Sequence, residues 1–328
     1  MKNLTILFIT TLLIAGCQSQ QSNIITYVDI YKGIDGLDMD FLPNSPPKEI
    51  YSGEEFFAGI QLENKGAFDI GNIARNEDEK GYEAYLSLVI EDDYMEVAEE
   101  GFKDIIPFSL EGKSTFNPKG TKNTTTIKLK AKDVDNQSES HTSLITVSAC
   151  YKYKTTLGTE ACIDADVYNL NQKAKACNVQ DQTFSGQGAP VVITKIESRM
   201  LPHEDESKVR PSFMIYIKNK GNGQVIKRDM IENVCTSITL DHEAFNTIYA
   251  NAKLSNQPLD CSPKEIQESE TKEGYIRLKD KEDFIRCTLT EGIKKNKGTY
   301  STPLTIELDY GYTLSATKEV KILKELNY

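Results

Sequence analysis

The seven cysteines are the residues of this chain whose chemistry is best constrained by their spacing. Six of them follow Cys17, at Cys150, Cys162, Cys177, Cys235, Cys261 and Cys287. Zinc sites usually contain Cys-x-x-Cys pairs or nearby histidines. No Cys-x-x-Cys occurs here, and none of the three histidines lies within six residues of a cysteine. An even number of cysteines at long intervals favours disulfides, so we expect neither a metal site nor a thiol nucleophile.

The first sixteen residues have the pattern of an export signal. Lys2 supplies a positive charge, and Leu4–Ile14 is an uncharged apolar run too short to span a bilayer. The run ends in Ile14-Ala15-Gly16-Cys17, which resembles the lipobox of prokaryotic lipoproteins. The resemblance implies that residues 1–16 are removed and that Cys17 carries a thioether-linked lipid as the new N-terminus. The alternative is an ordinary signal peptide cleaved nearby. Residues 17–24 are polar and rich in serine and glutamine, the composition of a flexible tether.

Disulfide pairing can be predicted in part from symmetry. An exported chain meets an oxidising environment, where cysteines pair. Cys150 and Cys162 are symmetric about Thr156, so a hairpin centred there would bring them face to face. For the other four cysteines we expect Cys177–Cys235 and Cys261–Cys287.

Acidic clusters raise the alternative of a bound cation. Glu91-Asp92-Asp93 with Glu96, or Glu77-Asp78-Glu79, could offer Ca²⁺ several carboxylate oxygens. His203-Glu204-Asp205-Glu206 is a similar candidate. No Asp-x-Asp-x-Asp-Gly loop is present, so we interpret these clusters as a solvated acidic surface.

Motifs of the common enzyme classes are missing. The chain has no Gly-x-Ser-x-Gly, no His-Glu-x-x-His, no Walker loop and no Gly-x-Gly-x-x-Gly opening a helix. We therefore expect a non-enzymatic protein without a cofactor. Asn123-Thr-Thr125 and Asn136-Gln-Ser138 match the N-glycosylation sequon, which makes Asn123 and Asn136 candidate modification sites in loops.

Several predicted strand segments occur twice along the sequence. Phe56–Gly66 alternates apolar and polar residues and ends in Asn-Lys-Gly, and Phe213–Gly221 does the same. Two further matches follow in the same order: Ile127–Lys132 with Ile276–Lys281, and Leu144–Tyr153 with Pro303–Tyr312. The three offsets are 155, 149 and 159 residues. Such ordered matches predict a tandem duplication of one β-rich unit.

Tyrosine pairs recur inside the last match, at Tyr151 with Tyr153 and at Tyr310 with Tyr312. Residues at i and i+2 share one face of a strand. Stacking on a carbohydrate is one interpretation of such pairs. We favour packing within the repeated architecture.

The remaining strands and turns define the predicted organisation. We expect residues 25–170 to form a first, acidic β-sandwich, residues 171–190 a linker, and residues 191–328 a second β-sandwich. Each is predicted to close with a hairpin, made by Leu144–Tyr153 with Ala161–Val167 and by Pro303–Tyr312 with Glu319–Leu323. Further strands are predicted at Ile24–Tyr31, Tyr82–Ile90, Thr124–Lys130, Val191–Ile196, Thr247–Leu254, Tyr275–Leu278 and Ile285–Leu289, and a helical turn within Lys227–Val234.

A strand of alternating hydrophobic residues that ends in Asn-x-Gly, as in Phe56–Gly66 and Phe213–Gly221, resembles the CARDB-type immunoglobulin-like domains of prokaryotic surface proteins. The whole chain also resembles two-domain prokaryotic, including archaeal, surface lipoproteins. These resemblances imply an all-β fold of two tandem Ig-like sandwiches and a role at the cell surface, without a catalytic site.

Charge separates the two predicted sandwiches. Residues 25–170 contain 27 acidic and 14 basic residues, whereas residues 171–328 contain 22 and 23. The acidic part, nearest the membrane, repels nucleic acid and anionic lipid. We therefore expect a lipid-anchored module outside the cytoplasm that binds a protein or glycan for adhesion or scaffolding. The alternatives are an accessory subunit of an envelope secretion, pilus or transport complex, and an unrecognised hydrolase of envelope polymers.

Overall fold

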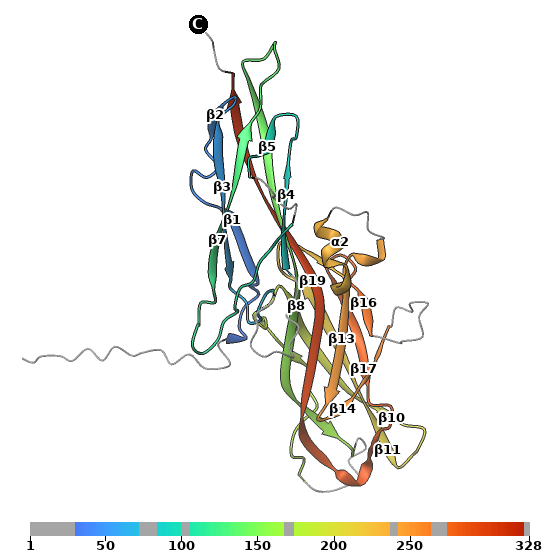
Figure 1. Ribbon diagram of the computed structural model, residues 1–328. Helices are drawn as coiled ribbons and strands as arrows, with labels where there is room; N and C mark the ends of the chain where they lie inside the picture. The colour runs from blue at the N-terminus through green and yellow to red at the C-terminus, as the bar shows by residue number, and fades with distance from the viewer. Residues whose placement is uncertain are drawn as a thin grey trace, which may run out of the picture.

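In a computed structural model, the described part of the chain is mostly β-strand, with one short α-helix (Figure 1). The structure describes residues 30–71, 84–99, 105–166, 174–236, 242–263 and 274–324. The predicted signal peptide, the tether, Cys17 and most of the strand predicted at Ile24–Tyr31 lie outside these residues. No helix among the described residues is long and apolar enough to cross a membrane.

The strands and short helices follow one another in this order: β1 (Leu37–Phe41), β2 (Glu49–Tyr51), β3 (Glu55–Asn64), β4 (Ala84–Ile90), β5 (Met95–Val97), β6 (Ile105–Pro107), β7 (Lys122–Ala131), β8 (Ser140–Asp164), β9 (Gln182–Thr183), β10 (Val191–Pro202), β11 (Lys208–Asn219), β12 (Gln224–Ile226), η1 (Arg228–Met230), α2 (Ile231–Cys235), η2 (His242–Ala244), β13 (Thr247–Leu254), β14 (Gln257–Pro258), β15 (Asp260–Ser262), β16 (Tyr275–Arg277), β17 (Glu282–Thr288), β18 (Ile293–Lys294), η3 (Lys295–Lys297) and β19 (Thr299–Leu323). The helical turn predicted within Lys227–Val234 is confirmed as η1 and α2.

Two very long strands hold the molecule together. β8 and β19 each contain 25 residues and pair antiparallel over their whole length, from Ser140 opposite Leu323 to Asp164 opposite Thr299. Figure 1 shows β8 (green) and β19 (red) running side by side through the upper and the lower part of the molecule. The predicted closing hairpins are therefore wrong: each predicted hairpin is one uninterrupted strand.

One face of this strand pair forms the floor of both hydrophobic cores. Odd-numbered β8 residues are buried from Ile145 to Leu157, and again at Ala161 and Ile163. Because side chains alternate along a strand, all of them point to the same side. A sheet with strand order β1-β3-β7-β5 packs on one part of this face, and a sheet containing β15-β17-β11-β10-β9 packs on the other part. The fold is thus an all-β sandwich fold with one sheet common to two cores.

Strand pairing repeats between the two halves of the chain. β1 and β10 pair with β3 and β11, which pair in turn with β7 and β17. Within the shared sheet, β4 pairs with β8 and β6, and β13 pairs with β19 and β16. This order makes β16 the counterpart of β6. The match of Ile127–Lys132 with Ile276–Lys281 is therefore wrong, because Ile127 lies in β7 and Ile276 in β16.

The halves are not separable along the chain. Val320 and Ile322, from the end of β19, are fully buried in the first core with Ile60 and Leu129. β2 also pairs parallel to the end of β19. The expected linker is part of the fold where it is described, since β9 forms an edge of the sheet of β10. The second half of the sequence thus completes the first core.

Three disulfides join the six cysteines, with pairings that differ from the expectation except for Cys261–Cys287. Cys162 pairs with Cys177, and Cys150 pairs with Cys235 of α2. The predicted Cys150–Cys162 and Cys177–Cys235 pairs are wrong. Cys150 and Cys162 lie twelve residues apart in one extended strand, a span of about 40 Å, whereas a disulfide needs Cα atoms within about 7 Å.

Candidate ligand-binding groove

A hollow of about 400 Å³ lies where the two sandwiches meet. We call it the junction groove. Its lining residues are Ile34–Met39, Lys65, Tyr151, Pro190, Lys220–Gly223, Tyr312, Leu314 and Ser315. Both halves of the sequence contribute, so the groove exists only in the folded chain. A smaller hollow of about 300 Å³ lies beside the Cys162–Cys177 disulfide.

The two Asn-Lys-Gly turns close the ends of β3 and β11 in the same way. The N–H of Gly66 donates to Asn64 Oδ1, and the N–H of Gly221 donates to Asn219 Oδ1, each at 3.1 Å. Each asparagine amide also donates to backbone carbonyls four residues on, at Phe68 and Gly223. The asparagines are buried, so these bonds satisfy side-chain groups that would otherwise be costly to bury. The repeated motif is therefore a structural turn, and it places Lys65 and Lys220 at the groove.

A cluster of four tyrosines lies behind these turns, and two of them, Tyr151 and Tyr312, line the groove. Tyr151, Tyr153, Tyr310 and Tyr312 are at most 2% exposed, and their rings contact one another at centroid distances between 5.6 and 6.3 Å. The Tyr151 and Tyr153 hydroxyls accept hydrogen bonds from the N–H groups of Leu37 and Phe68. The Tyr312 hydroxyl donates to Asn219 Oδ1 and accepts from Gly223 N–H. Burial confirms the packing interpretation of the recurring tyrosine pairs.

Burial of this cluster predicts loss of stability in alkali. Burial raises the pKa of Tyr312 to about 12, and it also raises the pKa of Tyr151, Tyr153 and Tyr310. Between about pH 10 and 12 the unfolded phenols ionise while the native ones stay protonated, so the unfolded state binds fewer protons. Unfolding free energy should fall there by up to about 1.4 kcal/mol per pH unit for each tyrosine. Urea unfolding at increasing pH measures this slope. Tyr312→Phe should make it shallower, and an unchanged slope would contradict the assignment.

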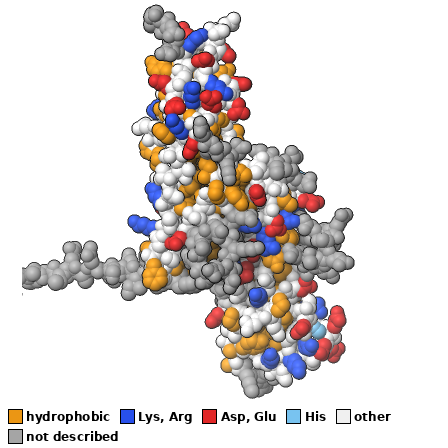
Figure 2. Space-filling model, viewed as in Figure 1, with side chains coloured by type: hydrophobic (Ala, Val, Ile, Leu, Met, Phe, Trp, Pro, Cys, Tyr) orange, Lys and Arg blue, Asp and Glu red, His pale blue; other side chains and the backbone are white. Residues whose placement is uncertain are grey.

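The rim of the groove carries charges of both signs. Lys65 Nζ lies 2.6 Å from Asp38 Oδ2, and this hydrogen bond raises the lysine pKa. Lys220 is exposed on the neighbouring turn. In the view of Figure 2, acidic and basic side chains are interspersed over both lobes rather than gathered by sign. A ligand of this groove would thus meet a rim with charges of both signs.

Strand edges form the two long walls of the groove. β1 is an edge strand, since it pairs with β3 on one side only among the described strands. The backbone N–H and C=O groups of its even-numbered residues face β3. The 2.9 Å hydrogen bond from the Lys65 N–H to the Gly36 carbonyl, just before β1, follows the same pattern. The Leu37 N–H is bonded to the Tyr151 hydroxyl, so on the groove side β1 offers the Leu37 carbonyl and the backbone groups of Met39. Leu314 and Ser315 of β19 form the facing wall. A groove with exposed main-chain groups in its walls can bind an extended chain.

The acidic clusters that were the alternative cation sites do not come together where the structure describes them. No group of three or more potential metal ligands is found among the described residues. Glu91 instead contacts His141 Nε2 at 2.9 Å and accepts a hydrogen bond from Ser143, and these contacts lower its pKa. Glu96 lies near Lys130 and Lys132. Glu77-Asp78-Glu79 lies outside the described residues.

The remaining predicted positions are distributed over the surface. His203 accepts from the N–H of Asp205 and its Nε2 lies 3.1 Å from the Thr290 carbonyl, so this segment is a local turn. Asn136 is exposed in a loop. Asn123 is exposed in β7, which corrects its placement in a loop.

Apart from the two Asn-Lys-Gly turns and the recurring tyrosines Tyr151 and Tyr312, the groove residues were not singled out by the sequence. The predicted hairpin places its turn between Tyr312 and Glu319, so it does not mark Leu314 and Ser315 as strand residues. A signal was present: this stretch, Tyr-Thr-Leu-Ser-Ala-Thr-Lys-Glu, contains no glycine, proline, asparagine or aspartate. A tight turn usually needs one of them, so its absence favours a continuous strand.

Comparisons with known proteins give little resemblance. No protein-family model matches the chain, and no curated protein matches it. A search of solved structures lists the C-terminal domain of the Streptococcus pyogenes antigen I/II-family protein AspA, at 6% identity over 89% of this chain and 100% of that chain. The TM-score of 0.18 is too low to support an argument about fold or function.

Proposed function

We propose that this chain is a non-catalytic binding module of the cell envelope, anchored by a lipid on Cys17. The three disulfides support a location outside the cytoplasm, because such bonds persist in oxidising compartments. The lipobox-like Ile14–Cys17 supports the anchor. The observation that carries the binding role is the junction groove, which is built from both halves of the chain and has strand edges in its walls.

The same groove favours a protein over a glycan as the partner. Main-chain N–H and C=O groups in a row are complementary to another extended backbone. An accessory subunit of an envelope complex is therefore the second candidate, and a glycan-binding adhesin is less well supported.

Chemical cross-linking in native membranes tests this function. The full chain should give one dominant cross-linked protein, identified by mass spectrometry. The Cys17→Ala variant should lose most of its membrane association and most of this product, since a chain without lipid has no anchor. Disulfide formation in the variant serves as a control for export and folding. Correct processing and membrane retention of Cys17→Ala would contradict the anchor, and absence of any cross-linked protein would contradict the binding role.

A further inference from the structure

One stretch of β19 lacks a neighbouring strand. The backbone groups of its odd-numbered residues face away from β8. Ser255 N–H donates to the Pro303 carbonyl, Lys321 N–H donates to the Lys48 carbonyl, and Ser52 N–H donates to the Leu323 carbonyl. The register of β19 with β8 is unbroken. Ser315, Thr317 and Glu319 must therefore point their N–H and C=O groups to that same side.

This side of β19 is paired on both flanks but not between them. β13 and β12 pair with it as far as Thr313, and β2 pairs with it from Lys321 onward. No described strand pairs with the residues between. We call the backbone of Ser315, Thr317 and Glu319 the open edge. The side chains of all three residues are exposed, so solvent reaches this part of the strand, and the lower end of the open edge forms a wall of the junction groove.

The shape of the open edge limits what can bind it. From Thr313 to Lys321 the strand rises by about 26 Å, the length of about seven residues of an added strand. β12 and β2 flank this space, which makes the open edge a recess in the sheet. The open edge of a second copy of the chain could not pair with this one, because β12 and β2 of the two copies would collide before the two open edges came into contact. A single extended chain can enter.

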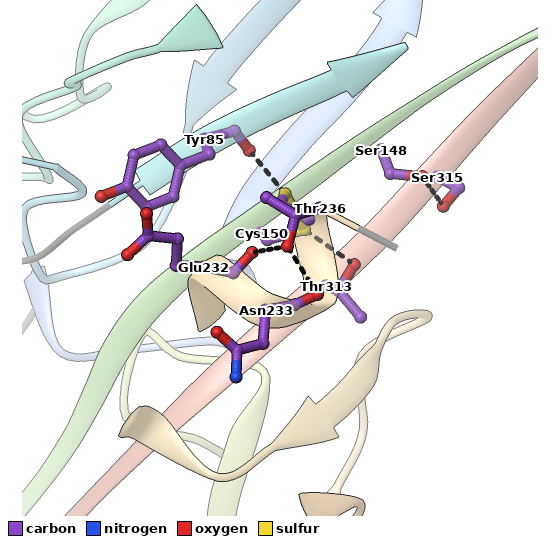
Figure 3. The surroundings of a disulfide bond; sticks show 9 residues. Tyr85, Ser148, Cys150, Glu232, Asn233, Thr236, Thr313 and Ser315 are labelled. Atoms are coloured by element: carbon purple, nitrogen blue, oxygen red, sulfur yellow. Dashed lines mark hydrogen bonds between the residues drawn. A yellow bond between two sulfur atoms is a disulfide. The ribbon is translucent and has the colours of Figure 1, made fainter. Parts of the chain in front are cut away.

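Neighbouring side chains set the chemistry of that chain. On the inner face, Ala316 packs against the first core, Met39 of β1 is 7% exposed, and the exposed Lys318 follows two residues after Ala316. On the outer face, Ser315 and Thr317 hydrogen-bond Ser148 and Thr146 across the strand pair, at 2.7 and 3.0 Å (Figure 3 shows Ser148 and Ser315). Because an added strand alternates its side chains between these faces, it should alternate apolar and polar residues.

We propose that the open edge binds an extended, alternating apolar–polar segment of a partner protein as an added β-strand. This inference rests on the proposed binding function and names the kind of partner and its site. The added strand would join β12 and β2 along the same side of β19, and its backbone would satisfy the N–H and C=O groups of Ser315, Thr317 and Glu319. The expected affinity comes from these main-chain bonds, and selectivity comes from the side chains that face Ala316 and Met39.

Proline at position 317 isolates the main-chain contribution. Thr317→Pro removes one N–H of the open edge and no bond to β8, because even-numbered residues make those bonds. Proline is tolerated in a strand where its missing N–H faces no partner, and β19 already contains Pro303 with its carbonyl on this side. Thr317→Val is the matched control: both variants lose the hydroxyl that contacts Thr146, and only proline loses the N–H.

Two measurements test the proposal on the full chain. In native membranes, a photo-crosslinking benzoylphenylalanine in place of Glu319 should capture one partner segment, while the same group in place of Phe57, exposed on the outer face of β3, should not capture it. Thr317→Pro should reduce the capture at Glu319 about tenfold, the equivalent of one backbone hydrogen bond, and Thr317→Val should leave it nearly unchanged. A synthetic peptide of alternating valine and threonine, with lysine at both ends, should slow amide exchange at Ser315, Thr317 and Glu319 in the purified chain.

The outcomes separate this inference from the proposed function. Equal capture by Thr317→Pro and Thr317→Val would overturn the added strand and leave the binding function standing. A cross-link to residues 18–29 of the same chain, or to a second copy, would also overturn it. Partner capture only at Phe57 would place the binding surface elsewhere. Absence of any partner in both positions and in chemical cross-linking would overturn the binding function itself.

Discussion

Gly66→Ala should destabilise the fold by about 4 kcal/mol, because the new methyl group has no room. Gly66 is buried in the first Asn-Lys-Gly turn, where an added Cβ would overlap the Tyr153 hydroxyl and lie 2.8 Å from the Asp35 carbonyl and 2.9 Å from the Gly188 carbonyl. The Asp35 and Gly188 carbonyls are backbone atoms of two different segments, so neither can move away from the new methyl group without shifting its segment. Displacing the tyrosine would also leave the Phe68 N–H without its hydrogen bond, a cost of about 1–3 kcal/mol for a buried donor.

Urea unfolding followed by circular dichroism measures this change, and Gly158→Ala is its control. Gly158 lies in β8 with no atom within 4 Å of an added Cβ, so alanine there should change stability by less than about 1 kcal/mol. Gly221→Ala should behave like Gly66→Ala, since its Cβ would overlap the Tyr312 hydroxyl and lie 2.7 Å from Pro190 Cβ. Equal stability of Gly66→Ala and Gly158→Ala would show that the turn does not pack against the tyrosine cluster.

Removing the Cys150–Cys235 disulfide should cost about 4.5 kcal/mol and loosen α2 from the strand pair. The two cysteines are 85 residues apart, and a cross-link across such a separation strongly restricts the unfolded chain. Figure 3 shows α2 lying across β8 and β19 at this bond. Around it, Ile226 and Ile231 are fully buried, with Tyr85 of β4 packed against them. The disulfide therefore ties the second half of the chain to strands of the first.

The double variant Cys150→Ser/Cys235→Ser isolates this effect, and Cys162→Ser/Cys177→Ser is its counterpart. The second pair is separated by only 15 residues, for which the same argument gives about 3 kcal/mol. Thermal unfolding should rank the Cys150–Cys235 variant as the less stable, and amide exchange should show faster opening in α2 and β4. The reverse ranking, or unchanged exchange in α2, would contradict the role of this bond as the tie between the halves.

The alternation of apolar residues predicted most of the longer strands, because a half-buried strand requires it whatever the neighbours are. β3 and β13 lie where this pattern placed them, and the Asn-Lys-Gly turns are explained by asparagine and glycine chemistry within a few residues. Cys261 and Cys287 also pair as expected. These features depend mainly on local backbone and side-chain preferences.

What joins these elements was decided by tertiary structure. Alternation is identical in a hairpin and in one long strand, so residues 144–167 gave no sign that β8 crosses both cores, and the Cys150–Cys162 prediction failed with the hairpin. Val320 could reach the first core only because β19 pairs with β8 along its whole length. The open edge likewise depends on where β12 ends and β2 begins. By itself, then, the sequence determined most of the longer strands, the two Asn-Lys-Gly turns and the even set of paired cysteines. The folded chain alone decided which strands share a sheet, which cysteines meet and where an edge stays open, because those contacts join residues far apart in the sequence.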